Sequence, residues 1–309
     1  MSGTKALLGG PRGLGVAAMA GCALLWSLAG LFIKLLDWNP FAIACGRSAV
    51  AALFILAWIR RPRFTLSGPQ VCAALANAAT MLLFVYANKA TTSANAILLQ
   101  YGEPVYVAII GSFALKERPK PEQWVALAFV AFGMGLFFAG APASGGGSGK
   151  DGLLGDAAAA TAGLTFALYT IFMRMQKNGS PVESALLSHV LAAAISLAIC
   201  LFLPAPRIDA RSIAAIAALG VLQIGLASVL FSVGIKRVTA MDASLIGVLE
   251  PVFNPVWVFL ATREAPGPDA FAGGGCIIAA VLGSTLLSLR REAREATRIR
   301  AKAESRSDT

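Results

Sequence analysis

One stretch of this sequence occurs twice, and the constant spacing between its two copies constrains the fold more than any other feature. Each copy carries a Glu-Pro pair inside an apolar segment of helix length, Glu103-Pro104 in the first and Glu250-Pro251 in the second. The residues that both copies share keep an offset of 147 positions without a gap; they also include Lys89 and Lys236, Glu117 and Glu264, Pro119 and Pro266, and Pro121 and Pro268. Such a repeat indicates that one structural unit has been duplicated.

The segments around the repeats are apolar enough to lie in a lipid bilayer. Hydrophobic residues make up 57% of the chain and charged residues only 14%, where a soluble protein has about a quarter charged residues. Runs of 18 or more apolar residues can cross ~30 Å of hydrocarbon. We therefore expect an all-α polytopic membrane protein with ten spans, at about 14–36, 40–60, 69–88, 92–115, 121–140, 152–175, 181–203, 211–235, 241–262 and 268–289. No removable signal peptide is expected in residues 1–12.

The basic residues predict the orientation of these spans. With the N-terminus inside, 19 of the 26 Lys and Arg residues fall on the inner side and six on the outer side, with Arg47 inside a span. Because basic residues are retained on the cytoplasmic side, both termini are expected in the cytoplasm and the chain in the plasma (inner) membrane. This pattern explains the net charge of +10 better than a nucleic-acid partner does.

An odd number of spans in each copy implies that the second copy enters the membrane upside down. The first spans of the copies also match, at an offset of 140: Gly15 with Gly155 and Phe32 with Phe172. We expect an inverted-topology repeat, the architecture in which two halves open a central site to either side. The division is residues 13–140 for the first repeat, 141–151 for a flexible Gly/Ser-rich linker and 152–290 for the second repeat. The basic cytoplasmic tail, 291–309, is expected to form a short surface helix.

Two five-span copies that each contain such a fourth span resemble the EamA domains of the drug/metabolite transporter superfamily. The residues that carry the resemblance are Leu249-Glu250-Pro251-Val252-Phe253, Glu264-Ala265-Pro266 and Arg47. The strings Gln100-Tyr101-Gly102-Glu103-Pro104 and Ala167-Leu168-Tyr169 are most similar to YddG-type amino-acid exporters. The resemblance implies ten helices around a central cavity, walled chiefly by spans 1, 3, 4, 6, 8 and 9.

The two glutamates have a functional and a structural interpretation. A carboxylate within the hydrocarbon costs at least ~2.5–3.5 kcal/mol and usually faces a cavity or a partner. Glu103 and Glu250 are therefore candidates for proton coupling or substrate contact. In the structural interpretation, which we favour, each satisfies backbone donors freed near its kink. Pro104 and Pro251 remove a helical hydrogen bond and predict a bend, and Pro255 predicts a second break; all three are candidates for hinges or cavity lining.

Further cavity candidates lie on polar and aromatic stripes of the spans that the family places around the cavity. They are Trp26 in span 1, Asn77 and Phe84 in span 3, Gln100 and Tyr101 in span 4, Thr165 and Tyr169 in span 6, and Gln223 and Phe231 in span 8. Each stripe could equally join packed helices by hydrogen bonds. In a straight helix Tyr101 points away from Glu103, so both reach one cavity only if the kink rotates the helix.

The remaining features have structural interpretations. Arg47 is expected to be an anchor rather than a clamp for a substrate carboxylate. His189 lies in span 7, which the family resemblance places at the periphery; carrying a proton is the alternative role for it. All five cysteines fall in apolar segments without metal-binding spacing, so no disulfide, metal or cofactor is expected. Trp58 and Trp124 are expected at the membrane interface. Small residues at Ala131, Gly135 and Ala139 and at Gly275, Ala279 and Gly283 predict close packing of spans 5 and 10.

These observations predict a secondary transporter that exports amino acids or related small metabolites, since the chain has no nucleotide-binding motif. Protons remain open as a coupling ion, and the chain is expected to be a monomer or a weak dimer. A drug or quaternary-cation exporter is the nearest alternative; it would need an uncompensated carboxylate and an aromatic cage. An intramembrane enzyme is disfavoured because the chain has one histidine and no GxSxG motif.

Overall fold

The computed structural model describes residues 10–33, 36–91, 93–139, 150–262 and 268–307, and every regular element among them is a helix. The predicted all-α architecture is thereby confirmed for this part of the chain. The first half of the chain contains α2 (Pro11–Trp26), α3 (Ala29–Ile33), α4 (Pro40–Ile59), α5 (Gly68–Ala90), α6 (Ser93–Gln100), α7 (Glu103–Ala114) and α8 (Pro121–Ala139). The predicted linker lies almost entirely outside the described residues.

The second half repeats this order with one irregularity in its third segment. Its elements are α9 (Lys150–Met175), α10 (Pro181–Cys200), α11 (Ala210–Ala218), the π-helix η1 (Leu219–Leu226), α12 (Ala227–Ile235), α13 (Ala240–Gly247), α14 (Leu249–Thr262) and α15 (Pro268–Ser307). Asp209 begins α11 with a capping box, in which its carboxylate accepts from the Ser212 backbone N–H. Capping and proline at the first helical turn recur at helix starts along the chain, and they set the boundaries between the apolar segments.

Seven helical segments of the described chain are long and apolar enough to cross a membrane, and α8 is a shorter apolar helix. The other two predicted spans, 14–36 and 241–262, are each divided into two helices, α2 with α3 and α13 with α14. The exposed side chains agree with a lipid environment, since Trp58 and Trp124 are 60% and 48% exposed. All five cysteines are free.

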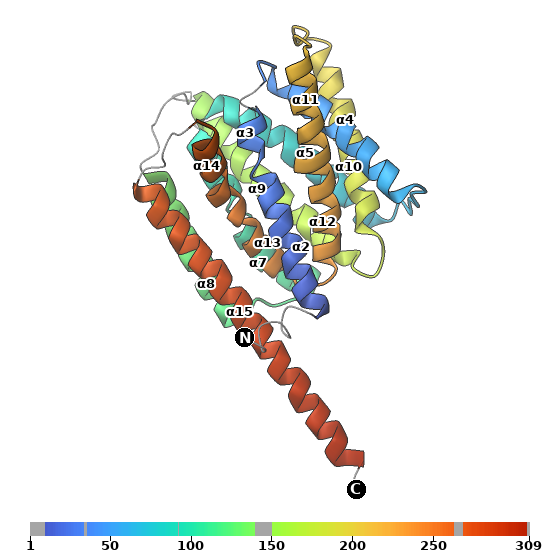
Figure 1. The fold of residues 1–309 in the computed structure, drawn as a ribbon, viewed down its shortest axis with the longest axis vertical. Coiled ribbons are helices and arrows are strands. Elements are labelled where there is room, and N and C mark those ends of the chain that lie inside the picture. The colour runs from blue at the N-terminus through green and yellow to red at the C-terminus, as the bar shows by residue number, and fades with distance from the viewer. Residues whose placement is uncertain (1–9, 34–35, 92, 140–149, 263–267, 308–309) are drawn as a thin grey trace.

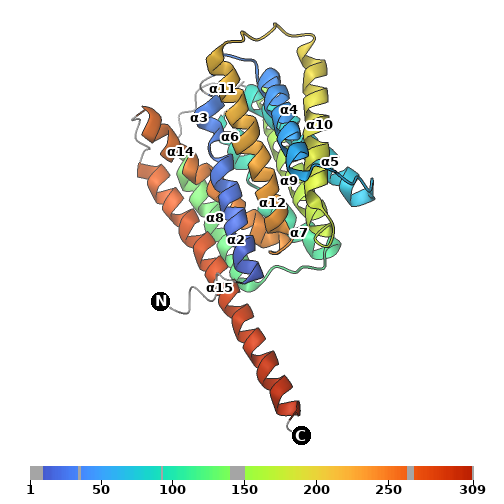
Figure 2. The same ribbon diagram turned by 45° about the vertical axis from the view of Figure 1, so that its right-hand side comes forward.

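Interruptions divide the helices nearest the centre of the bundle. In the two views of Figures 1 and 2, α8 and α15 lie side by side along one edge, α4 and α10 form the opposite side, and α2 and α13 run between them. The main buried cluster includes Met19, Val107, Tyr169, Phe231 and Ile246, which come from both halves of the chain. The core therefore lies between the halves and not within either one.

Helix packing follows the same pattern in both halves. The α5 helix packs on α9, and its counterpart α12 packs on α2; the α6–α7 pair packs on α9, and the α13–α14 pair packs on α2. Two glycines found at equivalent positions make equivalent contacts. A Cβ on Gly15 would lie 2.6 Å from Arg237 Cβ, and one on Gly155 would lie 2.7 Å from Thr91 N. Both positions therefore require glycine for the helices to approach.

The predicted stripes of small residues lie on the wrong faces of α8 and α15, although these helices do pack together. A Cβ added to Gly135, Gly275 or Gly283 would meet open space, and Ala131 and Ala279 are exposed. The close approach is instead made by Gly133 and Gly273, since a Cβ on Gly273 would lie 2.4 Å from the carbonyl oxygen of Gly133. The packed face also carries larger buried side chains such as Val130. A prediction based only on the spacing of small residues therefore chose the wrong face of each helix.

The C-terminal tail differs from the separate surface helix predicted for it. The α15 helix continues without interruption from its apolar part through residue 307 and projects beyond the bundle (Figure 1). Residues 284–307 contain neither glycine nor proline, and they are rich in Ala, Arg, Leu and Glu, which favour helix. No residue in this stretch gives the helix a reason to end.

Candidate central pocket

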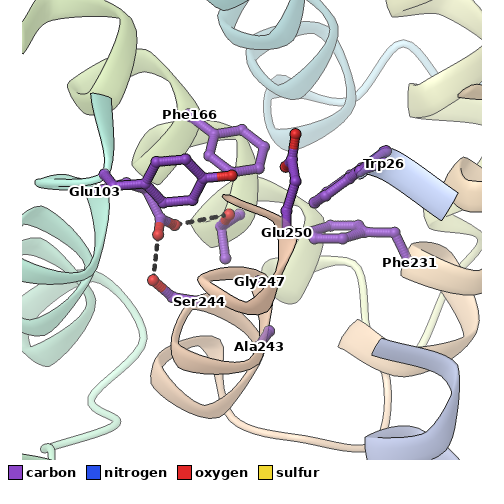
Figure 3. Close-up of a pocket in the computed structure, with 10 residues that line it drawn as sticks. Trp26, Glu103, Phe166, Phe231, Ala243, Ser244, Gly247 and Glu250 are labelled. Atoms are coloured by element: carbon purple, nitrogen blue, oxygen red, sulfur yellow. Dashed lines mark hydrogen bonds between the residues drawn. The ribbon is translucent and has the colours of Figure 1, made fainter. Parts of the chain in front are cut away.

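A central pocket lies where the interrupted helices of both halves meet. Its side chains come from α2, α7, α9, α12, α13 and α14 and from the turn before α7 (Figure 3). The lining residues are Trp26, Tyr101, Glu103, Phe166, Thr170, Phe231, Ala243, Ser244, Gly247 and Glu250. Trp26, Tyr101, Glu103, Phe231 and Glu250 were candidates from the sequence, and the structure brings these five together.

The break between α6 and α7 lets Tyr101 and Glu103 face the same pocket. Tyr101 and Gly102 form a turn, so the helix is interrupted just before Pro104. The carbonyl oxygen of Gln100, which Pro104 cannot bond, packs against α9, where a Cβ on Gly163 would lie 2.6 Å from it. The predicted interruption and the rotation that the two side chains require are both present.

The equivalent break in the second half lies at Val248, between α13 and α14. Gly247 and Glu250 line the pocket on either side of it, and Pro251 is buried. At Pro255 the second predicted break is wrong, since the α14 helix runs through this position. A proline leaves a carbonyl without its helical donor but does not require the helix to end. The side chain of Pro255 lies outside the described residues.

Glu103 is held by two hydroxyl groups from the second half. The hydroxyl of Thr170 donates to its Oε1 at 3.2 Å, and that of Ser244 donates to its Oε2 (Figure 3). The side chain is 3% exposed. Both carboxylate oxygens are therefore occupied, and the contacts fix Glu103 between α9 and α13.

Glu250 has a different environment, made mostly of aromatic rings. Its carboxylate lies between Phe166 on one side and Trp26 and Phe231 on the other (Figure 3). The hydroxyl of Tyr101 donates a hydrogen bond to this carboxylate, and Arg47 on α4 attracts it by its charge. In the described structure Glu250 thus has one hydroxyl donor where Glu103 has two.

The aromatic side chains form one continuous cluster around the pocket. Trp26 lies 5.7 Å from Phe166 and 5.6 Å from Phe231, measured between ring centroids. Tyr169 stands behind this wall, 2% exposed, and stacks on Phe166 at 6.1 Å and on Phe231 at 5.4 Å. Tyr169 therefore supports the lining without belonging to it.

The pocket is contracted in this conformation. The enclosed space is about 10 Å³, enough for roughly one water molecule. Sites for organic ligands usually measure about 300–1,000 Å³. At this size the pocket does not admit an organic molecule.

A buried polar cluster, here called the Asp242 cluster, ties four helices together at one end of the pocket. Nη2 of Arg12 donates to Asp242 Oδ2 at 2.5 Å and to Ser288 Oγ at 2.7 Å. Nε2 of Gln123 donates to Asp242 Oδ1 at 2.7 Å. Asp242 directly precedes the lining residue Ala243, so the cluster joins the N-termini of α2, α8 and α13 to α15 beside the pocket.

A second cluster, here called the Glu117 cluster, closes the same end from the other side. Nε of Arg174 donates to Glu117 Oε1 at 2.8 Å, and its Nη1 donates to the carbonyl of Ile235 at 2.9 Å. Glu117 also accepts from the backbone N–H of Ala240 at 3.1 Å. Arg174 lies one helical turn beyond Thr170 of the pocket. Both clusters connect the first half of the chain to the second.

Several candidates from the sequence lie outside the pocket, in contacts between helices. The amide of Asn77 donates to Ser188 Oγ at 2.8 Å, and Thr165 pairs with Thr80 at 2.8 Å, because α5 packs between α9 and α10. Phe84 packs in a separate alanine-rich cluster. Gln223 donates to the carbonyl of Trp26 at 3.5 Å. These positions correspond to the alternative interpretation of the stripes as contacts between helices.

The other polar candidates are also away from the lining. Gln100 is half-buried, and its Oε1 has no hydrogen-bond partner among the described residues. Nε of Arg47 likewise has no hydrogen-bond partner within the described chain. The guanidinium charge still acts on the side chains of Glu250 and His189. His189 shares a hydrogen bond with Ser228 at 2.9 Å. No group of His, Cys, Asp and Glu side chains in the described ranges could hold a metal ion.

Sequence reasoning missed Phe166, Thr170, Ala243, Ser244 and Gly247. The pocket face of α9 contains Phe166 and Thr170, one position beyond the stripe of Thr165 and Tyr169, and one position rotates a helix by 100°. The two faces are similarly apolar, so the sequence pattern did not distinguish them. Ser244 had a detectable signal: it lies with Asp242 in an apolar segment just before the Glu-Pro pair.

The comparisons with known proteins agree with this architecture. The sequence matches the EamA-like transporter family twice, over residues 13–139 and 153–286. Among 29 chains of solved structures that match, one described only as a protein crystal structure has a TM-score of 0.77. It is 22% identical and covers 91% of this chain and 99% of its own. No curated protein matches the sequence. The chain, a multi-pass membrane protein, belongs to the EamA-like transporter family.

Proposed function

We propose that this transporter exports small organic compounds bearing an ammonium group, and that Glu250 and the aromatic cluster bind that group. The observation that carries the proposal is the composition of the pocket. Two carboxylates and four aromatic rings line it, and none of its ten described lining residues is basic. A cation over an aromatic face gains about 0.5–2 kcal/mol, and a carboxylate in the same pocket adds charge attraction.

This substrate class is the alternative that the sequence left open, since its two requirements were an uncompensated carboxylate and an aromatic cage. Glu250 has one hydroxyl donor, from Tyr101, where Glu103 has two, and the rings of Trp26, Phe166 and Phe231 lie around it (Figure 3). The charge of Arg47 acts on Glu250 from outside the lining, and no cation is found among the described lining residues. A cationic substrate can therefore take the place next to Glu250.

Amino acids are the second candidate, and one observation favours them. Arg47 carries a buried N–H without a partner in the described chain, and its charge already reaches Glu250. An expanded pocket that included Arg47 could place a substrate carboxylate on Arg47 and the ammonium group on Glu250. This arrangement matches the amino-acid export that the sequence resemblance implies.

The proposed mechanism is alternating access by two inverted repeats of five spans, 13–140 and 152–290, joined by the 141–151 linker. The packing pattern supports it, because α5, α6 and α7 pack on α9 as their counterparts α12, α13 and α14 pack on α2. The equivalent contacts of Gly15 and Gly155 support it too. Exchange of conformation between such repeats would expose the central pocket to each side in turn.

In the proposed topology both termini and the basic tail are cytoplasmic, and the two polar clusters close the cytoplasmic end of the pocket. Asp242 and Glu117 each join groups from both repeats. Opening this end requires that the Arg12–Asp242 and Arg174–Glu117 contacts break. Binding energy from the substrate, or a coupling proton, would offset that cost.

Counterflow in proteoliposomes tests the proposed function. Two labelled compounds share a phenethyl group: phenethyltrimethylammonium, which keeps its charge at every pH, and phenylalanine, which adds a carboxylate. We expect counterflow of the quaternary compound. Faster counterflow of phenylalanine would replace the main candidate by the second. If unlabelled excess of neither compound drives uptake of its labelled form, both substrate classes are wrong.

A further inference from the structure

A second cavity opens on the outer wall of the bundle, where α4 and α12 end and α10 begins. It is a groove of about 220 Å³. Its walls are mostly apolar: Trp58, Pro181, Val182, Val229 and Val233 line it, together with Ser180 and Ser232. The basic side chains of Lys236 and Arg237 complete the lining at the end of α12. The groove thus combines an apolar channel with two cations at one end.

The groove is separate from the central pocket. Val229 and Val233 flank Phe231 at two positions on either side, and residues two apart point to nearly opposite faces of a helix. Phe231 lines the central pocket, and the two valines line the groove. Trp58 is 60% exposed, so this face belongs to the outside of the bundle.

The two basic side chains are held in place and keep free donors. Nζ of Lys236 donates to the carbonyl of Gly179 at 2.7 Å, and Nη1 of Arg237 donates to the carbonyl of Val233 at 2.7 Å. A lysine ammonium has three N–H donors and an arginine guanidinium has five. Both residues are exposed, and the groove lining in the described structure includes no carboxylate. The end of the groove is therefore complementary to an anion.

We propose that this groove binds an anionic phospholipid, with its phosphate on Lys236 and Arg237 and the upper part of an acyl chain along Pro181, Val229 and Val233. Basic pockets between membrane helices bind lipid headgroups on the cytoplasmic side, and tryptophan favours the headgroup level. The groove lies at helix ends, which is where a headgroup lies in either orientation. The assignment to the cytoplasmic leaflet rests on the proposed topology.

The same two cations could attract free phosphate, but the apolar walls distinguish a lipid from a soluble anion. An ion would leave Pro181 and the two valines without a ligand contact, whereas an acyl chain covers them. A lipid in the groove would also contact both α12 and the start of α10, two segments that the Lys236–Gly179 hydrogen bond already joins. The α12 helix carries Phe231 of the central pocket.

Native mass spectrometry of the delipidated full chain tests the proposal without measuring transport. The protein is mixed with equal amounts of phosphatidylglycerol and phosphatidylcholine that have the same acyl chains. We expect selective retention of phosphatidylglycerol. Lys236→Gln with Arg237→Gln should lower that retention about tenfold or more, since each cation near an anionic headgroup contributes to binding. Arg118→Gln, which removes an exposed cation that does not line the groove, should leave it unchanged.

A groove-filling variant, Val233→Phe, keeps both cations and should also lower retention of phosphatidylglycerol. Thermal unfolding of each variant checks that it is folded. Retention that is equal in wild type and in the doubly neutralised variant would overturn the proposal. Full competition by inorganic phosphate, with no effect of Val233→Phe, would assign the cations to a soluble anion and also overturn it. Because neither readout involves substrate, failure here leaves the proposed function to its own counterflow test.

Discussion

The two Glu-Pro breaks have the same sequence pattern but different surroundings. Glu103 accepts from Thr170 and Ser244, whereas Glu250 faces aromatic rings. At the offsets of 140 and 147, the residue equivalent to Thr170 is Gly30 and the residue equivalent to Ser244 is Ile97. Neither has a hydroxyl group that could donate to Glu250. The duplicated motif therefore holds the first carboxylate between two hydroxyl groups, whereas the second is the one that the proposed function assigns to the substrate. Repeat symmetry predicts where the breaks fall, and the residues that face them decide what each glutamate does.

The largest effect expected from this comparison is that of Glu250→Gln. Removing its charge should lower counterflow of phenethyltrimethylammonium about 10- to 100-fold, because a charged partner in a buried site contributes about 1.5–3 kcal/mol. The matched control is Glu122→Gln, which loses only an exposed ion pair with Arg291. If the two variants transport alike, Glu250 is not the residue that binds the cation.

The next effect concerns the closed end of the pocket. In a cysteine-free background, Ala243→Cys reports access to the pocket beside the Asp242 cluster. Asp242→Asn should raise its labelling by an impermeant maleimide about tenfold in inside-out vesicles, because the amide still accepts from Arg12 but loses the charge, which costs the closed state about 1.5 kcal/mol. Glu122→Gln again serves as the control. Greater labelling from the opposite side would contradict the proposed topology.

A smaller effect on transport, together with a loss of stability, is expected for Glu103→Gln. The amide still accepts from the hydroxyls but without charge, so we expect the unfolding temperature to fall by a few degrees and counterflow to stay within about threefold of wild type. Ser244→Ala, which removes one donor, should resemble it. Loss of counterflow in a variant whose unfolding temperature is unchanged would make Glu103 a transport residue.

An effect on selectivity alone is expected behind the lining, at Tyr169. Tyr169→Leu removes the ring that stacks on Phe166 and Phe231, and such ring contacts contribute about 0.5–1.5 kcal/mol. Competition by aromatic compounds should weaken about two- to tenfold relative to aliphatic ones. Trp124→Leu, at an exposed position of α8, should leave the ranking unaltered. An unchanged ranking in Tyr169→Leu would mean that Phe166 and Phe231 keep their positions without the Tyr169 ring.

The helical segments could be read from the sequence because apolar length and proline or capping residues determine them locally. The breaks before Pro104 and Pro251 followed from the missing N–H of proline. The hydroxyl partners of Glu103 could not be predicted, since Thr170 and Ser244 are brought to it by packing between the halves. The same limitation applied to Thr165 and to the small residues predicted to pack α8 against α15. Periodicity identifies residues that share a face of a helix, but only the packed structure shows which neighbour that face contacts.

Ligand binding as a function of pH tests most directly whether Glu250, and not Glu103, binds the substrate. Calorimetry measures the affinity for phenethyltrimethylammonium at each pH. Because this ligand keeps its charge at every pH, any change in affinity comes from titration of groups in the protein. Protonation of Glu250 removes the charge that attracts the cation, so affinity in wild type should fall as pH falls, and Glu103→Gln should keep that slope. Glu250→Gln should bind weakly at every pH. A pH slope that persists in Glu250→Gln, or one lost only in Glu103→Gln, would contradict the account.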